Sequence, residues 1–147
     1  MIKPRIFITG GTGFIGSHLV DKLVEEGYPL TVFSRESSSI RFIESHIKKG
    51  KVRLIRGDIE NKEEITKAMK DCEILMHNAA MVGDWGKFED FYKANVKGTE
   101  NILEAARKNK IKKIIFTSSN AVLGEENCPL AKLESAPYKP IYLYFLY

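Results

Sequence analysis

The sequence of 147 residues is long enough to bury one core and too short for two ordinary domains. Its 44% hydrophobic and 29% charged residues are typical of a globular chain rather than a disordered one. The net charge of +4 arises from 23 basic residues interleaved with 19 acidic ones, so no concentrated basic stripe indicates a nucleic-acid partner.

The sequence also lacks the patterns of membrane insertion, secretion and metal binding. No apolar stretch reaches the ~18 residues of a membrane helix, and the N-terminal segment does not have the regions of a signal peptide. Cys72 and Cys128 stand apart, and the three histidines are scattered along the chain. We therefore expect a cytoplasmic, metal-free protein without a membrane or nucleic-acid partner.

Short apolar segments alternate with helical patterns along the chain. The first segment, residues 5–9, is closed by glycines and predicts a buried parallel strand. A helical row of Ile15, Leu19 and Leu23 follows and ends at Gly27. Four further strands are predicted at 30–34, 51–56, 73–77 and 112–118. The remaining helices are predicted as a weak one over 37–49, a short one begun by the capping pair Asn61 and Glu64, and a long one over 88–110.

Strands that alternate with helices are joined by right-handed crossovers and form a parallel sheet. The sequence therefore predicts an α/β fold, a Rossmann-type parallel sheet of about five strands flanked by helices. In such a sheet a ligand binds beyond the carboxyl ends of the strands, in the crevice where the strand order reverses.

The most specific pattern is TGGTGFIG at residues 9–16, which follows the first strand and opens the first helix. Its glycines can permit a tight turn, let the backbone approach a pyrophosphate and let the helix pack closely on the sheet. Free backbone N–H groups and the positive end of the helix dipole would then face the phosphates. The alternative is a structural turn without a ligand.

This segment resembles the T-G-x-x-G-x-x-G signature of the extended short-chain dehydrogenase/reductases, the NAD-dependent epimerase/dehydratase superfamily. Four further motifs match that family in its order: RGDI at 56–59, HNAA at 77–80, NVKGTEN at 95–101 and FTSS at 116–119. The run VGDWG at 82–86 leans toward the branch of dihydroflavonol reductases and 3β-hydroxysteroid dehydrogenases. The likeness extends from residue 1 to about residue 138.

The resemblance implies a cofactor site made of three segments. Asp58 and Ile59 would lie beside the adenine, with the carboxylate accepting from its amino group. Asn78, Ala79 and Ala80 would pass close to the cofactor at the end of the fourth strand. Two alternatives stay open, because Asp58 could merely start a loop and the two alanines could be a close-packing pair. The pyrophosphate would be held by the glycine turn, which consists of Gly10, Gly11, Thr12, Gly13, Phe14, Ile15 and Gly16.

The end of the second strand indicates which nicotinamide cofactor is bound. An acid there binds the ribose hydroxyls of NAD, whereas a basic residue accommodates the 2′-phosphate of NADP. Where related NAD-dependent sequences place Asp, this chain has Ser34, followed by Arg35, which can bind a phosphate through two hydrogen bonds. Glu36 is an acid and mildly favours NAD. The alternative for Arg35 is an ordinary surface arginine that binds no phosphate. We expect NADP(H), with NAD as the alternative.

The resemblance also implies a catalytic Ser, Tyr and Lys, of which the Tyr exchanges a proton with the substrate oxygen as hydride moves to or from the nicotinamide. Ser119 matches the serine, with Ser118 as the fallback and a plain strand end as the alternative. Tyr144 lies at a spacing from Ser119 that the family commonly uses. The Tyr-x-x-x-Lys pair is nevertheless missing, because the Lys would fall one position past Tyr147.

Asn95 lies in an otherwise apolar helical row with Phe91 and Ile102, so its amide should be buried and hydrogen-bonded. The resemblance implies a place for Asn95 in the proton-relay network behind the active site. A structural Asn that bonds a loop is the alternative.

The sequence changes character after Pro140. Residues 132–140 still resemble the approach to the catalytic Tyr, whereas IYLYFLY at 141–147 is apolar and aromatic, which suggests a truncated or frame-shifted reading frame. We expect a dinucleotide-binding domain over 1–140, an apolar tail over 141–147 and no substrate-binding region. The tail, an open edge of the fifth strand and a second apolar helical row predict a homo-oligomer. That row consists of Tyr92, Val96 and Leu103.

Two functional hypotheses follow. The first is an NADP(H)-binding oxidoreductase or epimerase-type protein that is catalytically incomplete in this chain. The second is a non-enzymatic protein that binds a dinucleotide and reports its redox state to a partner.

Overall fold

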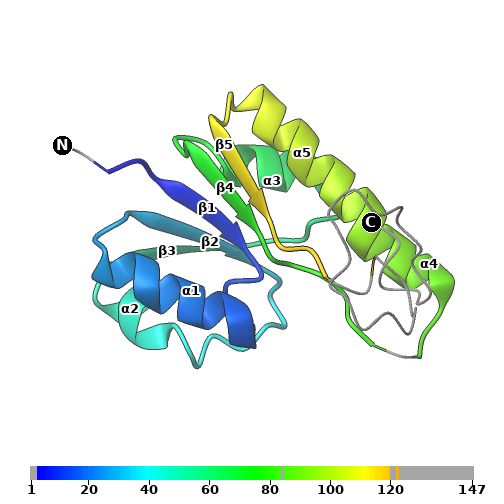
Figure 1. The fold of residues 1–147 in the computed structure, drawn as a ribbon, viewed down its shortest axis with the longest axis horizontal. Helices are drawn as coiled ribbons and strands as arrows, with labels where there is room; N and C mark the ends of the chain where they lie inside the picture. The colour runs from blue at the N-terminus through cyan, green and yellow to red at the C-terminus, as the bar shows by residue number, and fades with distance from the viewer. Residues whose placement is uncertain (1–2, 84, 120–121, 123–147) are drawn as a thin grey trace, which may run out of the picture.

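The computed structural model describes residues 3–83, 85–119 and 122. They form a parallel sheet with the strand order β3-β2-β1-β4-β5 and with helices on both faces (Figure 1). The strands are β1 (Ile6–Thr9), β2 (Leu30–Ser34), β3 (Val52–Arg56), β4 (Ile74–His77) and β5 (Lys113–Phe116). The helices are α1 (Phe14–Glu25), α2 (Glu44–Lys48), α3 (Lys62–Ala68), α4 (Phe88–Phe91), the π-helical segment η1 (Tyr92–Lys97) and α5 (Gly98–Lys108).

Two hydrophobic layers hold the sheet between its helices. Phe7 on β1 belongs to the layer under α3 and α5, where it packs with Ile65 and Ile102. Ile6 and Ile8, its neighbours along the strand, belong to the layer under α1 and α2. Because successive side chains of a strand point to opposite faces, burial on both faces requires an unbroken apolar run. This requirement explains why β1 and β2, which are buried throughout, could be recognised from short apolar segments.

The strand order reverses at β1. β1 pairs with β2 on one side and with β4 on the other, so that Ile6 lies opposite both Leu30 and Ile74. The chain first builds outward to β3 and then returns across the sheet to add β4 and β5 (Figure 1). The segments that leave β1 and β4 therefore diverge at the carboxyl end of the sheet, which opens the crevice where a Rossmann-type fold binds its ligand.

Two helical segments differ from their prediction. The segment over 37–49 is helical from Glu44 to Lys48, because the serines before it bond to the local backbone and favour turns; the backbone N–H of Arg41, for example, donates to Ser39 Oγ at 3.4 Å. The long helix predicted over 88–110 is interrupted by the π-helical segment η1. The cap of α3 matches its prediction, since Asn61 Oδ1 accepts from the backbone N–H groups of Glu63 and Glu64.

Some of the features from which self-association was predicted lie within the described residues. Within the described residues β5 pairs with β4, and Ile114, Ile115 and Phe116 are 45%, 40% and 40% exposed. Tyr92 and Leu103 on the second helical row are also exposed. The tail over 141–147 lies outside the described residues, so the homo-oligomer and the proposed domain limits stay predictions. None of the described helices is long and apolar enough to cross a membrane.

Candidate cofactor site

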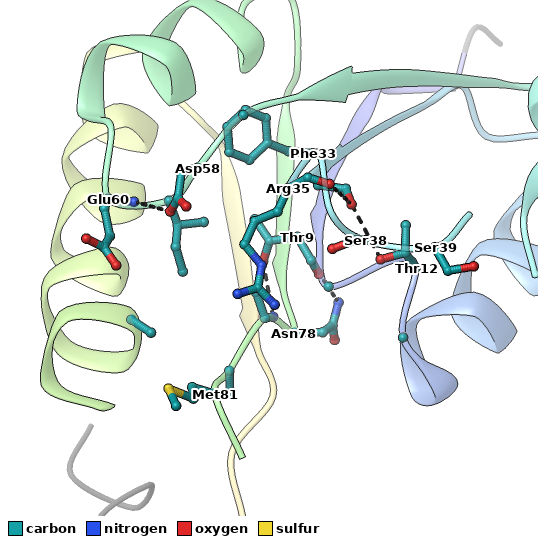
Figure 2. A pocket seen from close by; sticks show the side chains of 18 of the residues that line it. Thr9, Thr12, Phe33, Arg35, Ser38, Ser39, Asp58, Glu60, Asn78 and Met81 are labelled. Atoms are coloured by element: carbon teal, nitrogen blue, oxygen red, sulfur yellow. Dashed lines mark hydrogen bonds between the residues drawn. The ribbon is translucent and has the colours of Figure 1, made fainter. Parts of the chain in front are cut away.

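A cavity of about 720 Å³ lies at the carboxyl ends of the central strands. Figure 2 shows Thr12, Ser38 and Ser39 on one side and Asp58 on the other, with the side chain of Arg35 extending between them. The predicted site residues that line this cavity are Gly10, Thr12, Gly13, Ser34, Arg35, Asp58, Ile59, Asn78, Ala79 and Ala80. The structure therefore brings together four segments that are far apart in the sequence.

The glycine turn is compact because two backbones meet there. Gly10 has φ +69, and a Cβ on this residue would lie 2.7 Å from the backbone nitrogen of Ala79. A Cβ on Gly16 would overlap the carbonyl oxygen of Gly10, so α1 packs directly on the turn. These are the tight turn and the close helix packing that the glycine pattern predicts. Gly11 is buried in the same turn, where a Cβ would lie 3.1 Å from Val32 Cγ1.

The first turn of α1 leaves its backbone N–H groups available to an anion. Gly13 is the N-cap residue, no side chain caps the helix, and the first turn carries no acidic residue. The side chains of Phe14 and Ile15 are 73% and 66% exposed and are not among the residues that line the cavity. Their part in a cofactor site would therefore come from the backbone, where the free N–H groups and the helix dipole suit a phosphate.

The end of β2 presents hydroxyl groups and one guanidinium to the cavity. Ser34 Oγ lies 3.5 Å from Thr12 Oγ1, which connects the end of β2 to the glycine turn. Ser38 and Ser39 follow Arg35 on a turn that is closed by the Ser38 N–H donating to the Arg35 carbonyl at 3.1 Å. Glu36, one residue after Arg35, does not line the cavity. No sequence pattern had indicated Ser38 or Ser39.

The loop after β3 is ordered by hydrogen bonds to its backbone. The backbone N–H of Glu60 donates to Asp58 Oδ1 at 3.0 Å, and the backbone N–H of Asp58 donates to Glu64 Oε2 at 3.1 Å. Asn101 Nδ2 holds the carbonyl of Ile59 at 3.1 Å. Asp58 therefore starts a loop, which was the alternative to a role at the adenine, and it also lines the cavity. The two interpretations are compatible, because Oδ1 serves the loop and leaves Oδ2 for a ligand.

The end of β4 is tied to both neighbouring strands. Asn78 Nδ2 donates to the carbonyl of Thr9 at 3.3 Å, and Thr117 Oγ1 donates to Asn78 Oδ1 at 2.5 Å. The backbone N–H of Ala79 donates to Thr9 Oγ1 at 3.2 Å. These bonds fix the chain that carries Ala79 and Ala80 past the cavity, so close packing and a cofactor-facing position occur together at these alanines.

A buried histidine underlies this arrangement and was missed by the sequence analysis. His77 is 1% exposed, and its Nδ1 and Nε2 lie 2.5 Å and 3.0 Å from the hydroxyls of Thr9 and Thr99. Burial lowers the pKa of His77 to about 4, so the ring is neutral near pH 7. In this state one ring nitrogen donates and the other accepts, which suits two hydroxyl partners. Its place in the motif HNAA was the one available signal.

Asn95 is buried, as predicted, and bonds a loop at the cavity. The backbone N–H of Met81 donates to Asn95 Oδ1 at 2.7 Å, and Asn95 Nδ2 donates to the Met81 carbonyl at 3.0 Å. Asn95 lies within η1, and π-helical turns inside α-helices are frequent at functional sites. These contacts are those of a structural Asn that bonds a loop. A place for Asn95 in a proton relay stays a prediction.

The predicted catalytic residues do not meet at the cavity within the described part of the chain. Ser119 follows β5, is half-buried and is not among the lining residues. Tyr144 lies outside the described residues. Among the residues that the structure describes, no group of three or more His, Cys, Asp or Glu side chains could hold a metal ion.

The fold and the site together define a Rossmann-type domain with its ligand cavity at the strand-order reversal. Residues 6–146 match the model of the NAD dependent epimerase/dehydratase family. The chain belongs to this family, which confirms the resemblance drawn from its motifs.

Individual relatives span several reactions. The chain is 33% identical over 139 residues to a 2-alkyl-3-oxoalkanoate reductase of Shewanella oneidensis, covering 93% of this chain and 34% of the relative. It is 31% identical over 142 residues to the human sterol-4-alpha-carboxylate 3-dehydrogenase, decarboxylating, covering 95% and 36%. The crystal structure of Thermus thermophilus UDP-glucose 4-epimerase in complex with NAD has a TM-score of 0.84 and 30% identity, covering 96% and 46%. The chain thus spans a third to a half of these proteins' lengths.

Gly16→Ala should disrupt the cavity, because the added methyl group would overlap the backbone of Gly10 and push α1 away from the turn. We expect the affinity for a nicotinamide dinucleotide to fall by about tenfold or more, as for the loss of a phosphate contact. Isothermal titration calorimetry measures the affinity, and Gly83→Ala is the matched control because its methyl group would make ordinary contacts. Unchanged binding by Gly16→Ala would contradict this account of the turn.

His77 should make the fold acid-sensitive. Its lowered pKa means that the unfolded chain binds a proton between pH 6.5 and about 4 while the folded chain does not, so stability falls as the pH falls through this window. The loss attributable to His77 approaches about 3 kcal/mol. Urea unfolding at several pH values should show a steeper acid loss in the unmutated protein than in His77→Gln. The exposed His18→Gln is the control, and equal pH slopes for all three proteins would contradict the prediction.

Proposed function

We propose that this chain is the NADP(H)-binding part of an oxidoreductase or epimerase-type protein of the NAD-dependent epimerase/dehydratase family. One observation carries the proposal: a single cavity joins the uncapped start of α1 to a guanidinium and several hydroxyl groups at the end of β2. The first suits a pyrophosphate, and the second suits a phosphate on the adenosine ribose. When bound, the cofactor would supply the hydride chemistry, and the chain's residues hold and orient it.

The proposed division of the cavity follows its chemistry. The backbone N–H groups at the start of α1 hold the pyrophosphate, and Gly10 and Gly13 line the cavity beside it. Asp58 and Ile59 hold the adenine, with Asp58 Oδ2 accepting from its amino group. Arg35 binds the 2′-phosphate, supported by four hydroxyl groups that line the same end of the cavity. These belong to Thr12, Ser34, Ser38 and Ser39.

The choice of NADP(H) over NAD(H) rests on charge at the end of β2. The 2′-phosphate is a dianion near neutral pH, and it would be repelled by the acid that binds the ribose hydroxyls of NAD. In this chain Ser34 occupies that position, and Glu36 does not line the cavity. The related epimerase was solved with NAD, so this choice is a property that we assign to the present chain.

The catalytic part of the proposal follows the family pattern. Ser119 would hydrogen-bond the substrate oxygen, and Asn95 would hold the loop at Met81 beside the cofactor. No Tyr in the 147 residues is followed four positions later by Lys, so we propose that this chain alone binds the cofactor without substrate turnover. The relatives include reductases and epimerases, so the leaning toward the dihydroflavonol reductase branch stays a prediction, as does the redox-sensing alternative.

Arg35→Ala should remove the preference for NADPH. We expect the unmutated protein to bind NADPH more tightly than NADH, and the substitution to weaken NADPH binding by about 1–3 kcal/mol because a charge-assisted phosphate contact is lost. NADH binding should change little, since it has no 2′-phosphate. Calorimetric titration of both cofactors measures the two affinities.

Arg107→Ala is the matched control for this experiment, because it removes an exposed arginine from the last turn of α5 and leaves the cavity unchanged. Equal affinities for NADPH and NADH in the unmutated protein would overturn the assignment of the cofactor. Equal losses in Arg35→Ala and Arg107→Ala would show that general charge, rather than a contact of Arg35, governs binding.

A further inference from the structure

The guanidinium of Arg56 lies behind the end of the cavity where Arg35 and the hydroxyl groups gather. Arg56 ends β3 and pairs in register with Ser34 at the end of β2. Its Nη1 lies 3.3 Å from Ser34 Oγ, 2.6 Å from the carbonyl oxygen of Arg35 and 3.1 Å from the carbonyl oxygen of Ser38. One side chain from the neighbouring strand therefore bonds to three oxygens of the segment that begins at Ser34.

These contacts restrain both ends of one turn. The Ser38 N–H donates to the Arg35 carbonyl at 3.1 Å, which closes the turn, and Arg56 bonds to the carbonyls of its first and last residues. Ser38 and Ser39 line the cavity, whereas Arg56 does not. The guanidinium of Arg56 thus lies on the side of the turn where its carbonyl groups point. The residues Ser38 and Ser39 face the cavity.

None of the ion pairs among the described residues involves Arg35 or Arg56. Arg56 is half-buried, so its charge is screened less by solvent than that of a surface arginine. Arg35 directly follows β2 and Arg56 ends the adjacent strand β3. Two cations with hydroxyl groups near them favour the binding of a dianion.

We propose that Arg56 is a positioning residue for recognition of the 2′-phosphate of NADP(H), an inference that rests on the function proposed above. It holds the turn that carries Arg35 and Ser38, and it adds a second positive charge behind the phosphate. A cofactor with a free ribose 2′-hydroxyl has no group that needs either contribution. Arg56 therefore acts on the preference between the two cofactors rather than on nucleotide binding in general.

Arg56→Met and Arg56→Lys test this role, with NADP⁺, NAD⁺, 2′,5′-ADP and 5′-AMP as calorimetric probes. In Arg56→Met we expect the affinity for NADP⁺ and 2′,5′-ADP to fall by about tenfold or more, and the affinity for NAD⁺ and 5′-AMP to change by less than about threefold. Arg56→Lys should lose part of the preference, because an ammonium group retains the charge but cannot span the same set of acceptors.

Arg53→Met is the matched control, because Arg53 also lies on β3 but donates to the carbonyl of Ala68, away from the cavity. It should leave the ratio of NADP⁺ to NAD⁺ affinity unchanged. If Arg56→Met does not fold, Arg56→Lys decides the question, and an unchanged ratio in that variant contradicts the proposal.

The outcomes also separate this inference from the function on which it rests. A lack of preference between NADP⁺ and NAD⁺ in the unmutated protein would overturn the cofactor assignment itself. A clear preference that survives Arg56→Met, or an equal loss of affinity for all four probes, would overturn the role of Arg56 alone. A selective loss of the two 2′-phosphorylated probes would support it, since a general structural defect would weaken all four.

Discussion

The packing of two backbones at the carboxyl ends of β1 and β4 is the constraint on which the rest of the structure depends. Gly10 lies so close to the peptide of Asn78 and Ala79 that a Cβ would not fit. Thr9 completes the junction: its hydroxyl meets His77 and the N–H of Ala79, and its carbonyl accepts from Asn78. A shift of either strand by one residue would break these bonds together and would turn buried side chains to the wrong face.

The cavity follows from this junction because the chain diverges on both sides of it. On one side the glycine turn leads into α1 and leaves the start of that helix without a side-chain cap. On the other side the segment after β4 is held by the amide of Asn95. The end of β2, held by Arg56 from β3, closes the cavity with a surface of hydroxyl groups and positive charge. Hydrogen-bond donors and the guanidinium of Arg35 thus line the part of the cavity that we assign to phosphates, away from Asp58 on the opposite side.

Much of the fold could be predicted because local patterns determine it. The central strands β1 and β2 are buried on both faces and read as short apolar runs, and the turn at Gly10 and Gly16 requires residues without a side chain. The helix over 37–49 was overestimated, since its serines form turns instead. The π-helical segment η1 could not be predicted, because no local pattern encodes it or the tertiary contact that Asn95 within it makes to Met81.

Site residues that belong to a recognisable motif could be predicted from the sequence. Roles that depend on tertiary contacts could not. The glycine turn, Asp58 and Asn78 stand in recognisable motifs and line one cavity. His77 and Arg56 also stand in motifs, but their roles depend on partners that are distant in the sequence, such as Thr9 and the turn after Ser34. Charged and hydroxyl groups can be counted in a sequence, whereas only the structure shows on which side of a turn they lie.

A crystal structure of the protein with NADP⁺ tests the central claim most directly. The account predicts the pyrophosphate at the start of α1 and the 2′-phosphate within hydrogen-bond distance of Arg35 and at least one of the hydroxyl groups of Ser34, Ser38 and Ser39. Asp58 would then lie beside the adenine. A nucleotide bound elsewhere, or in this cavity with its 2′-phosphate directed away from Arg35 into solvent, would contradict the account.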